Sequence, residues 1–521
     1  MSRHFNTAGP CHPEKHYMLP PERRLPGVRD LIDQEHYFVI HAPRQVGKTT
    51  CFHTLARQLT AEGRYAALLT SCEAGQILTP DLESSVAAIL DTLIQDSEEY
   101  LPEDLRPPTA DPARPAASRF RDLLVRWARQ CPRPVVLFLD EIDALLDDAL
   151  ISVLRQLRSG YRARPQGFPQ SMALIGLRDV RDYRLGVRPE GRSLGSSSPF
   201  NIKVESLRLR NFNAEEVAEL YAQHTAETGQ VFTPEAAALA FELTGGHPWL
   251  VNALAREAVE KLAPDPASPV TAEIITAAKE ALIQRRDTHL DSLIDRLRES
   301  RVRRVIEPIL AGELLPPEVL DDDLQLVQDL GLVTAGPRGL AIANPIYREV
   351  IPRALTSVLQ QSVSVPRLSY TDTVGHLCFD QLLDDFRAFW CENASEILSR
   401  APYSEAAAQL VFMAFLHKVV NGGGFIDREF AVGSGRVDLC VRWPHPAGVE
   451  RWAVELKVWR DGRPDPLSEG LAQLSGYLAR LGLDQGTLVL FDQRTKAFPL
   501  PERCTREERE HEGRKIAVLR L

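Results

Sequence analysis

One segment, residues 41–50 (HAPRQVGKTT), constrains the fold more than any other part of the sequence. It follows an apolar run rich in β-branched and aromatic residues, 37–41 (YFVIH), and it precedes a stretch with helical periodicity. Its pattern is an alanine, four variable residues and then Gly47-Lys48-Thr49. A turn of this kind between a buried strand and a helix directs backbone N–H groups toward phosphate oxygens. We therefore expect a parallel α/β sheet with a phosphate-binding loop.

The chemistry of this loop indicates ATP with Mg²⁺ as its ligand. Gly47 lets the backbone turn, Lys48 can reach the β- and γ-phosphates, and the Thr49 hydroxyl can ligate Mg²⁺. Ala42 stands where the more usual pattern has a glycine. The residues predicted to surround the nucleotide phosphates are Ala42, Pro43, Arg44, Gln45, Val46, Gly47, Lys48, Thr49 and Thr50.

An acidic pair at the end of a second apolar run predicts hydrolysis as well as binding. Residues 135–141 (VVLFLDE) place Asp140 at the carboxyl edge of a buried strand, where a carboxylate can hold Mg²⁺ together with Thr49. Glu141 follows directly and is suited to activate the attacking water. We therefore expect Asp140 and Thr49 as metal ligands and Glu141 as a catalytic residue.

The first half of the chain predicts a sheet followed by helices. Short apolar runs alternate with helical patterns, which is typical of a parallel sheet with crossover helices. The predicted strands are residues 37–41, 65–69, 135–139 and 172–176. Beyond them, helices starting at the N-cap residues Asn213 and Thr233 predict a compact helical lid.

The remaining half predicts a winged helix and a further α/β domain. The winged helix is indicated by two helical segments followed by a strand-turn-strand pattern, and we favour an interaction or regulatory role for it over DNA binding because its middle helix opens with Asp321-Asp322-Asp323. The predicted boundaries are 1–210 for the ATPase core, 211–290 for the lid, 291–356 for the winged-helix-like domain, 357–374 for a linker and 375–521 for the last domain.

These features resemble the AAA-like and STAND-type P-loop ATPases over roughly residues 15–355. In that group an arginine after the fourth strand lies near the γ-phosphate, and Arg178 matches it. A Gly-x-Pro signature in the lid places a proline against the nucleotide, and residues 245–248 (GGHP) are similar, with Pro248 as the matching proline. The alternatives remain a surface arginine for Arg178 and simple helix initiation for Pro248.

A second set of polar residues lies in the last domain. Asp438 falls in one predicted strand (GRVDLCVRW), and Glu455 and Lys457 fall in the next (RWAVELKVW). Because Glu455 and Lys457 are two residues apart, they share one face of their strand. Asp438 and Glu455 could hold Mg²⁺, and Lys457 could orient or deprotonate an attacking water. The alternative is an ordinary glutamate–lysine pair on a sheet, worth less than about 1 kcal/mol.

This set resembles the PD-(D/E)xK nuclease superfamily over about residues 375–521. The resemblance implies a restriction-endonuclease-like α/β fold, with Asp438, Glu455 and Lys457 as catalytic residues and Asp438 and Glu455 as metal ligands. Gln473 and Tyr477 are similar to the QxxxY motif of its RecB-like branch, and Glu405 is placed like an upstream acidic residue of the superfamily. Solvated or structural roles remain open for Gln473, Tyr477 and Glu405.

Composition excludes several other classes. The net charge of −10 argues against a broadly basic nucleic-acid-binding surface, although a local basic groove remains compatible with it. No apolar run approaches the roughly 20 residues needed to span a bilayer, so we expect no membrane partner. The N-terminus lacks the apolar core of a signal peptide, and the eight cysteines form no CxxC pair, so we expect a cytoplasmic protein with free thiols. No HExxH pattern indicates a zinc enzyme.

The sequence therefore predicts an ATP-hydrolysing switch coupled to a Mg²⁺-dependent DNA nuclease. The resemblance implies a role in bacterial defence or DNA processing, with ATP and DNA as partners and with a protein trigger or self-association open. The alternative is a regulatory or scaffold protein whose last domain docks DNA or a partner without cleavage. A motor that acts along DNA is a further alternative, which predicts a ring oligomer and DNA-stimulated hydrolysis.

Overall fold

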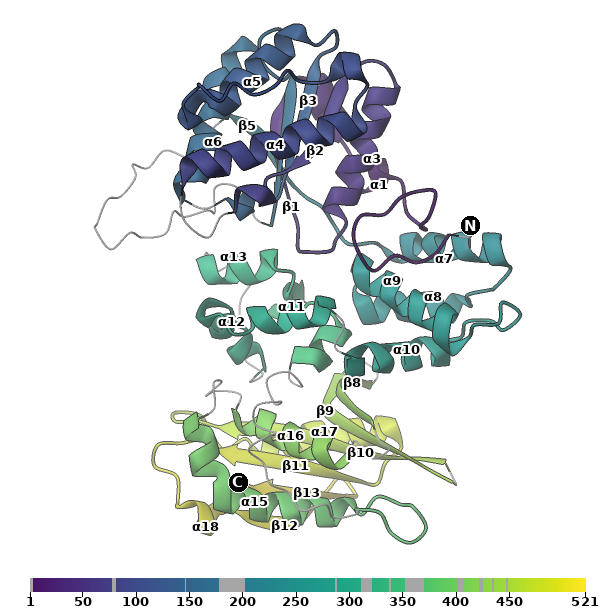
Figure 1. Ribbon diagram of the computed structural model, residues 1–521. Coiled ribbons are helices and arrows are strands. Elements are labelled where there is room, and N and C mark those ends of the chain that lie inside the picture. The colour runs from purple at the N-terminus through teal and green to yellow at the C-terminus, as the bar shows by residue number, and fades with distance from the viewer. Residues whose placement is uncertain are drawn as a thin grey trace. The chain divides into compact units, whose positions relative to one another are not determined.

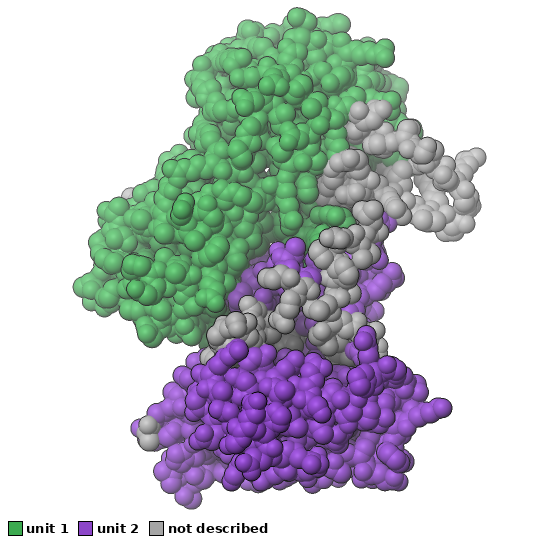
Figure 2. Space-filling view, turned by 180° about the vertical axis from the view of Figure 1, so that it is seen from behind, with its two compact units in different colours: residues 1–287, 325–333 green, residues 288–324, 334–521 purple. Residues whose placement is uncertain are grey.

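The computed structural model describes the following residues: 3–76, 81–145, 147–177, 202–285, 288–310, 321–336, 339–351, 370–400, 407–420, 425–432, 435–446 and 448–521. The chain divides into two compact units, one of residues 1–287 with 325–333 and one of residues 288–324 with 334–521 (Figure 2). The domain boundaries predicted from the sequence stay predictions.

The first unit is built on a five-stranded parallel sheet with the strand order β2-β3-β4-β1-β5 (Figure 1). Its strands are β1 (Tyr37–His41), β2 (Ala66–Ser71), β3 (Val135–Asp140), β4 (Ser171–Gly176) and β5 (Lys203–Arg208). The four strands predicted from apolar runs are confirmed to within two residues. β5 was not predicted, because this edge strand (KVESLR) is polar and partly exposed.

Helices cover both faces of this sheet because alternate strand residues enter different cores. Tyr37 and Val39 belong to a core shared with α4, α5 and α6, whereas Phe38 and Ile40 belong to a core shared with α2 and α3. The helices are α1 (Pro21–Arg24), α2 (Val28–Asp33), α3 (Lys48–Ala61), α4 (Leu82–Tyr100), α5 (Ala116–Gln130) and α6 (Asp147–Gly160). This is the parallel α/β arrangement of a P-loop nucleoside triphosphatase.

A helical segment follows the sheet and begins where its capping residues predict. The Asn213 side chain accepts a hydrogen bond from the Glu216 backbone in a capping box, and Thr233 caps the next helix, which has Pro234 at its first position. The helices are α7 (Ala214–Thr228), α8 (Pro234–Thr244), α9 (Pro248–Glu257), which continues into a π-helical turn (Ala258–Leu262), and α10 (Ala272–Arg285).

The next elements are short helices and a small two-stranded sheet. They are α11 (Thr288–Arg296), α12 (Ser300–Leu310), α13 (Asp322–Asp329), β6 (Val333–Gly336) and β7 (Gly339–Ile342). This order of helices and strands is compatible with the predicted winged helix, whose assignment stays a prediction.

The C-terminal part of the chain is a mixed α/β domain around a six-stranded sheet with the order β12-β13-β11-β10-β9-β8. β10 pairs parallel to β11 and antiparallel to β9. The strands are β8 (Phe425–Val432), β9 (Gly435–His445), β10 (Gly448–Trp459), β11 (Gln485–Asp492), β12 (Thr505–His511) and β13 (Arg514–Arg520). The helices are α15 (Phe379–Arg400), α16 (Ala407–Val420), α17 (Leu467–Leu481) and α18 (Leu500–Arg503).

Different helices cover the two faces of this second sheet. Leu490 on β11 shares a core with Leu474 and Leu478 of α17. The next residue, Phe491, points to the opposite face, where its ring lies 5.1 Å from that of Trp390 on α15. α17 and α15 therefore pack on opposite faces of this sheet.

In the described residues, no helix combines the length and the apolar character needed to cross a membrane. The cysteines of the described residues form no disulfide.

Candidate functional site

The predicted phosphate loop joins β1 to α3 and has the backbone conformation that the glycine requires. Gly47 has a φ of 92°, in the left-handed region that other residues rarely adopt, and Gln45 also has a positive φ of 58°. Gly47 is the N-cap residue of α3 and has no side chain to cap the helix. The N–H groups of the first turn of α3 therefore remain for an external anion such as phosphate.

Lys48 is folded back over its own loop. Its Nζ donates hydrogen bonds to the carbonyl oxygens of Ala42 at 2.7 Å and Pro43 at 2.9 Å. Burial lowers the pKa of Lys48, and the carboxylates of Asp140 and Asp143 oppose that shift. Phosphate oxygens can replace these carbonyls as acceptors, so the ammonium is already held where the phosphates would bind.

The strand order brings Asp140 to the phosphate loop. β4 lies between β1 and β3, and all three strands end at the same edge of the sheet. The Thr49 hydroxyl donates to Asp140 Oδ2 at 2.6 Å, and Asp140 is only 3% exposed. Burial raises the pKa of the Asp140 carboxyl. A hydroxyl and a carboxylate in contact at this position fit the oxygen ligands that Mg²⁺ prefers.

Glu141 lies at the rim of the same site, in an acidic neighbourhood. It has a φ of 51° and directly follows β3, and burial of its carboxylate, together with the charges of Glu73 and Asp140, raises its pKa to about 7. Asp143 adds a further negative charge and accepts a hydrogen bond from the Leu177 N–H at 3.2 Å. Neighbouring carboxylates repel one another, and a bound divalent cation would relieve this repulsion.

The other predicted loop residues occupy several environments. Ala42 and Val46 are buried, whereas the side chains of Arg44 and Gln45 are exposed. The Thr50 hydroxyl accepts a hydrogen bond from the Cys11 N–H at 3.0 Å, so this residue contacts the N-terminal segment of the chain.

The structure places the residue before Pro248 at the phosphate loop. His247 is buried, and burial lowers its pKa to about 4, while the nearby backbone of Arg44 opposes that shift. Gly246 packs so closely on the segment before α7 that a Cβ there would lie 1.9 Å from the Phe212 carbonyl oxygen. Pro248 itself is buried at the first position of α9. Arg178 lies outside the described residues.

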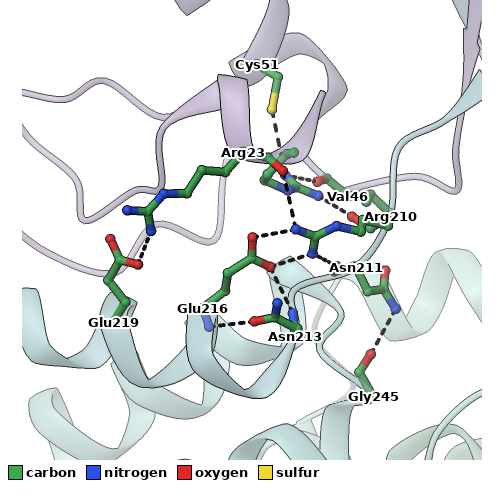
Figure 3. A network of polar contacts seen from close by, with 10 residues as sticks. Arg23, Val46, Cys51, Arg210, Asn211, Asn213, Glu216, Glu219 and Gly245 are labelled. Atoms are coloured by element: carbon green, nitrogen blue, oxygen red, sulfur yellow. Dashed lines mark hydrogen bonds and ion pairs between the residues drawn. The ribbon is translucent and has the colours of Figure 1, made fainter. Parts of the chain in front are cut away.

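Sequence reasoning missed a network of polar contacts that joins the phosphate loop to the helical segment (Figure 3). Arg24 is 5% exposed and donates to the carbonyl oxygens of Val46 at 2.8 Å and Arg210 at 2.6 Å. Arg210 in turn pairs with both carboxylate oxygens of Glu216, at 2.6 and 2.7 Å. Glu216 also accepts from the Asn213 N–H at the start of α7. Arg24 occurs in an ordinary charged run (PERR), which carries no signal of this role.

In the C-terminal domain, the structure brings Asp438, Glu455 and Lys457 together on neighbouring strands. Asp438 Oδ2 accepts from the Leu456 N–H at 2.8 Å, and Lys457 Nζ donates to Glu455 Oε1 at 2.9 Å. Glu455 is 3% exposed. Burial and the Asp438 charge raise the pKa of Glu455, while Lys457 opposes the shift. Burial lowers the pKa of Lys457, but the Glu455 and Asp438 carboxylates outweigh burial and raise it overall.

The helix over this face adds one of the predicted residues to the set. Gln473 on α17 accepts a hydrogen bond from Lys457 Nζ at 2.6 Å and donates to Glu469 at 3.1 Å. Tyr477 is half-buried one turn later and packs against the core under α17. Glu405 lies outside the described residues.

Comparisons with known proteins support the first of these two sites. Residues 28–166 match the family described as AAA ATPase domain. The search of curated proteins finds no match.

Several solved structures match about two thirds of this chain. A Walker-type ATPase of Pyrococcus abyssi has 14% identity and a TM-score of 0.47, over 67% of this chain and 99% of its own. The Holliday junction branch migration motor RuvB of Thermotoga maritima has 16% identity and a TM-score of 0.34, over 66% of this chain and 94% of its own. Cdc6p of Pyrobaculum aerophilum has 14% identity and a TM-score of 0.32, over 66% and 96%. These scores are below 0.5 and decide nothing about function. The match to the AAA ATPase domain family covers residues 28–166, which include the phosphate loop and Asp140, and we call this part of the chain the AAA-type domain.

Proposed function

We propose that ATP binding and turnover in the AAA-type domain control a Mg²⁺-dependent DNA nuclease site formed by Asp438, Glu455 and Lys457. The supporting observation is Glu455 Oε2, which is buried and has no hydrogen-bond partner among the described residues. A buried carboxylate oxygen without a partner costs free energy that a ligand can recover. A divalent cation between Asp438 and Glu455 is the ligand that suits such an oxygen.

Each residue of the set has a part in phosphodiester hydrolysis. The carboxylates of Asp438 and Glu455 would hold Mg²⁺, which when bound stabilises the charge that develops on the scissile phosphate. Lys457 lies within hydrogen-bond distance of Glu455 and would orient the attacking water. The Gln473 side chain gives the ammonium group of Lys457 a second hydrogen-bond acceptor.

In the AAA-type domain, the roles follow from the geometry of the loop. Lys48 would exchange its carbonyl partners for phosphate oxygens, and Thr49 and Asp140 would hold Mg²⁺. Glu141 would accept a proton from the water that attacks the γ-phosphate. ATP turnover then switches the chain between states that differ in the nuclease activity of its C-terminal domain.

The test is DNA cleavage by the purified full chain with Mg²⁺, in the presence of ATP, ADP or no nucleotide. We expect Lys457→Ala to lower the cleavage rate by about 10²–10³-fold, the usual effect of removing a group that stabilises a transition state. Lys515→Ala is the matched control, because Lys515 is an exposed lysine on β13 of the same sheet. Equal cleavage by both variants, or no cleavage by the wild type with any nucleotide, would contradict the nuclease proposal.

The same preparation distinguishes the docking alternative. A docking module would bind DNA without cleaving it and would have no Mg²⁺ or Mn²⁺ site that depends on Asp438. Calorimetric titration of Mn²⁺ into the wild type and into Asp438→Asn decides this point.

A further inference from the structure

A separate group of potential metal ligands lies in the C-terminal domain. His376 precedes α15, His445 is the last residue of β9, and Glu450 lies near the start of β10. One ligand atom from each of the three side chains lies within 4.8 Å of the others. We propose that His376, His445 and Glu450 bind a divalent transition-metal ion of the Zn²⁺ class.

The spacing of the three donors is close to what such an ion needs. Ligand atoms about 2.1 Å from a tetrahedral ion lie about 3.4 Å apart. His376 Nδ1 lies 2.6 Å from Glu450 Oε1, and the rings of His376 and His445 have centroids 4.3 Å apart. Small side-chain rotations therefore suffice to place all three donors around one ion, with the fourth position left for water.

The types of ligand select the ion. Imidazole nitrogens with one carboxylate suit Zn²⁺ and its neighbours in the first transition series, whereas Mg²⁺ and Ca²⁺ favour oxygen ligands. The simpler interpretation is a surface ion pair between His376 and Glu450, worth about 1 kcal/mol or less. An ion pair with Glu450 needs only one histidine. The presence of a second imidazole, that of His445, beside the first is required for metal binding and is not explained by an ion pair.

The backbone and outer contacts hold the ligands in place. The Leu377 N–H donates to Glu450 Oε2 at 3.3 Å, and the His376 N–H donates to the carboxylate of Asp372 at 2.9 Å. Trp443, which pairs with Glu450 across the two strands, donates from Nε1 to the Gly375 carbonyl at 2.9 Å. These contacts hold the turn that carries His376 against the β9–β10 hairpin, as outer contacts do in known metal sites.

This group is distinct from the proposed nuclease site, although both use β9 and β10. Glu450 and Glu455 are five positions apart, an odd number, on a regularly paired strand, so they point to opposite faces of the sheet. Five residues of strand also separate them by about 17 Å along β10. The ion would therefore clamp the segment before α15 to the hairpin, on the face away from α17.

The test uses the full chain, stripped with a chelator and titrated first with Co²⁺ and then with Zn²⁺. We expect about one Co²⁺ per chain with the visible absorption of a four-coordinate site, displacement by Zn²⁺, and a rise in melting temperature with Zn²⁺. The double variant His376→Ala/His445→Ala should lose the Co²⁺ absorption. Glu450→Gln, which keeps nearly the same shape, should bind at least about 10-fold more weakly, as should Trp443→Phe through loss of an outer contact.

Two controls make the outcome decisive. His511→Ala, on β12 of the same domain, and Glu455→Gln, in the proposed nuclease site, should both keep the Co²⁺ absorption of the wild type. Loss of Co²⁺ binding in Glu455→Gln but not in the double variant would assign the metal to the other site and overturn the proposal. Absence of Co²⁺ and Zn²⁺ binding by the wild type, or equal binding by every variant, would overturn it as well.

Discussion

The phosphate loop and the C-terminal acidic site each hold a lysine beside a carboxylate, but they hold it in different ways. Lys48 is fixed by the carbonyls of Ala42 and Pro43, residues of its own loop. Lys457 is fixed by side chains, the carboxylate of Glu455 and the amide of Gln473 on a separate helix. The first arrangement is encoded by one short segment, whereas the second depends on how a strand and a helix pack.

This difference determines how each site responds to substitution. Carbonyl partners supplied by the backbone cannot be removed by exchanging a side chain, so only changes to the reactive groups themselves should disable the phosphate loop. The C-terminal site, by contrast, should weaken whenever any of its supporting side chains is lost. The predictions below test that contrast in order of decreasing effect.

The largest effect is expected for Glu141→Gln in the first site. Loss of the group that accepts the water proton should lower ATP hydrolysis by about 10²–10⁴-fold. Because Lys48 and Thr49 are untouched, the affinity for ATP should stay close to that of the wild type. Steady-state phosphate release and nucleotide binding by calorimetry measure the two quantities. Glu98→Gln, an exposed glutamate on α4, is the control; unchanged hydrolysis in Glu141→Gln would assign Glu141 a structural role.

An intermediate effect, on the free energy of unfolding, is expected for Arg24→Met, at a residue that contacts the phosphate loop through Val46. The substitution removes three hydrogen bonds of a buried guanidinium, one of them to Cys51 Sγ, and leaves the carbonyls of Val46 and Arg210 without these donors. The free energy of unfolding should fall by about 3 kcal/mol. Urea denaturation of the full chain measures the change.

The neighbouring arginine provides the control for that measurement. Arg23 forms an ion pair with Glu219 at the surface, and Arg23→Met should cost less than about 1 kcal/mol. Equal losses in the two variants would show that the buried contacts of Arg24 add nothing to the phosphate loop.

The smallest effect is expected for Gln473→Ala in the second site. Lys457 would lose its contact with α17 but keep Glu455, so DNA cleavage should fall by about 10-fold, the lower end of what a supporting contact contributes. The rate of cleavage at saturating Mg²⁺ measures it, with the exposed Gln485→Ala as control. A loss as large as that in Lys457→Ala would mean that Gln473 contacts the substrate itself.

The contrast between the sites also explains what could be predicted from sequence. The strand before the phosphate loop was predicted at residues 37–41 and is found there, since a buried parallel strand is an uninterrupted apolar run. The helices predicted to start at the N-cap residues Asn213 and Thr233 are confirmed, because short side chains with an acceptor oxygen mark a helix start in the sequence. β12 (TREEREH) was not predicted, because its charged residues carry no apolar alternation.

Residues that act through tertiary contacts could not be predicted from the sequence, for a different reason. Glu73 comes near Glu141 only because β2 pairs with β3, with Ser71 opposite Asp140. Arg24 is far from Arg210 in the chain and carries no motif. His376 lies outside the strands that carry His445 and Glu450, so no local spacing pattern could have joined them.

The regular pairing of β10 with β9 has one more consequence. Side chains alternate between the two faces of a strand, so a shift of pairing by one residue exchanges the faces. A single-residue deletion between Glu450 and Glu455 would therefore turn one of these two carboxylates away from its partners while leaving every other residue of the domain in the chain. The number of residues between Glu450 and Glu455 therefore matters for both sites as much as the identity of those residues.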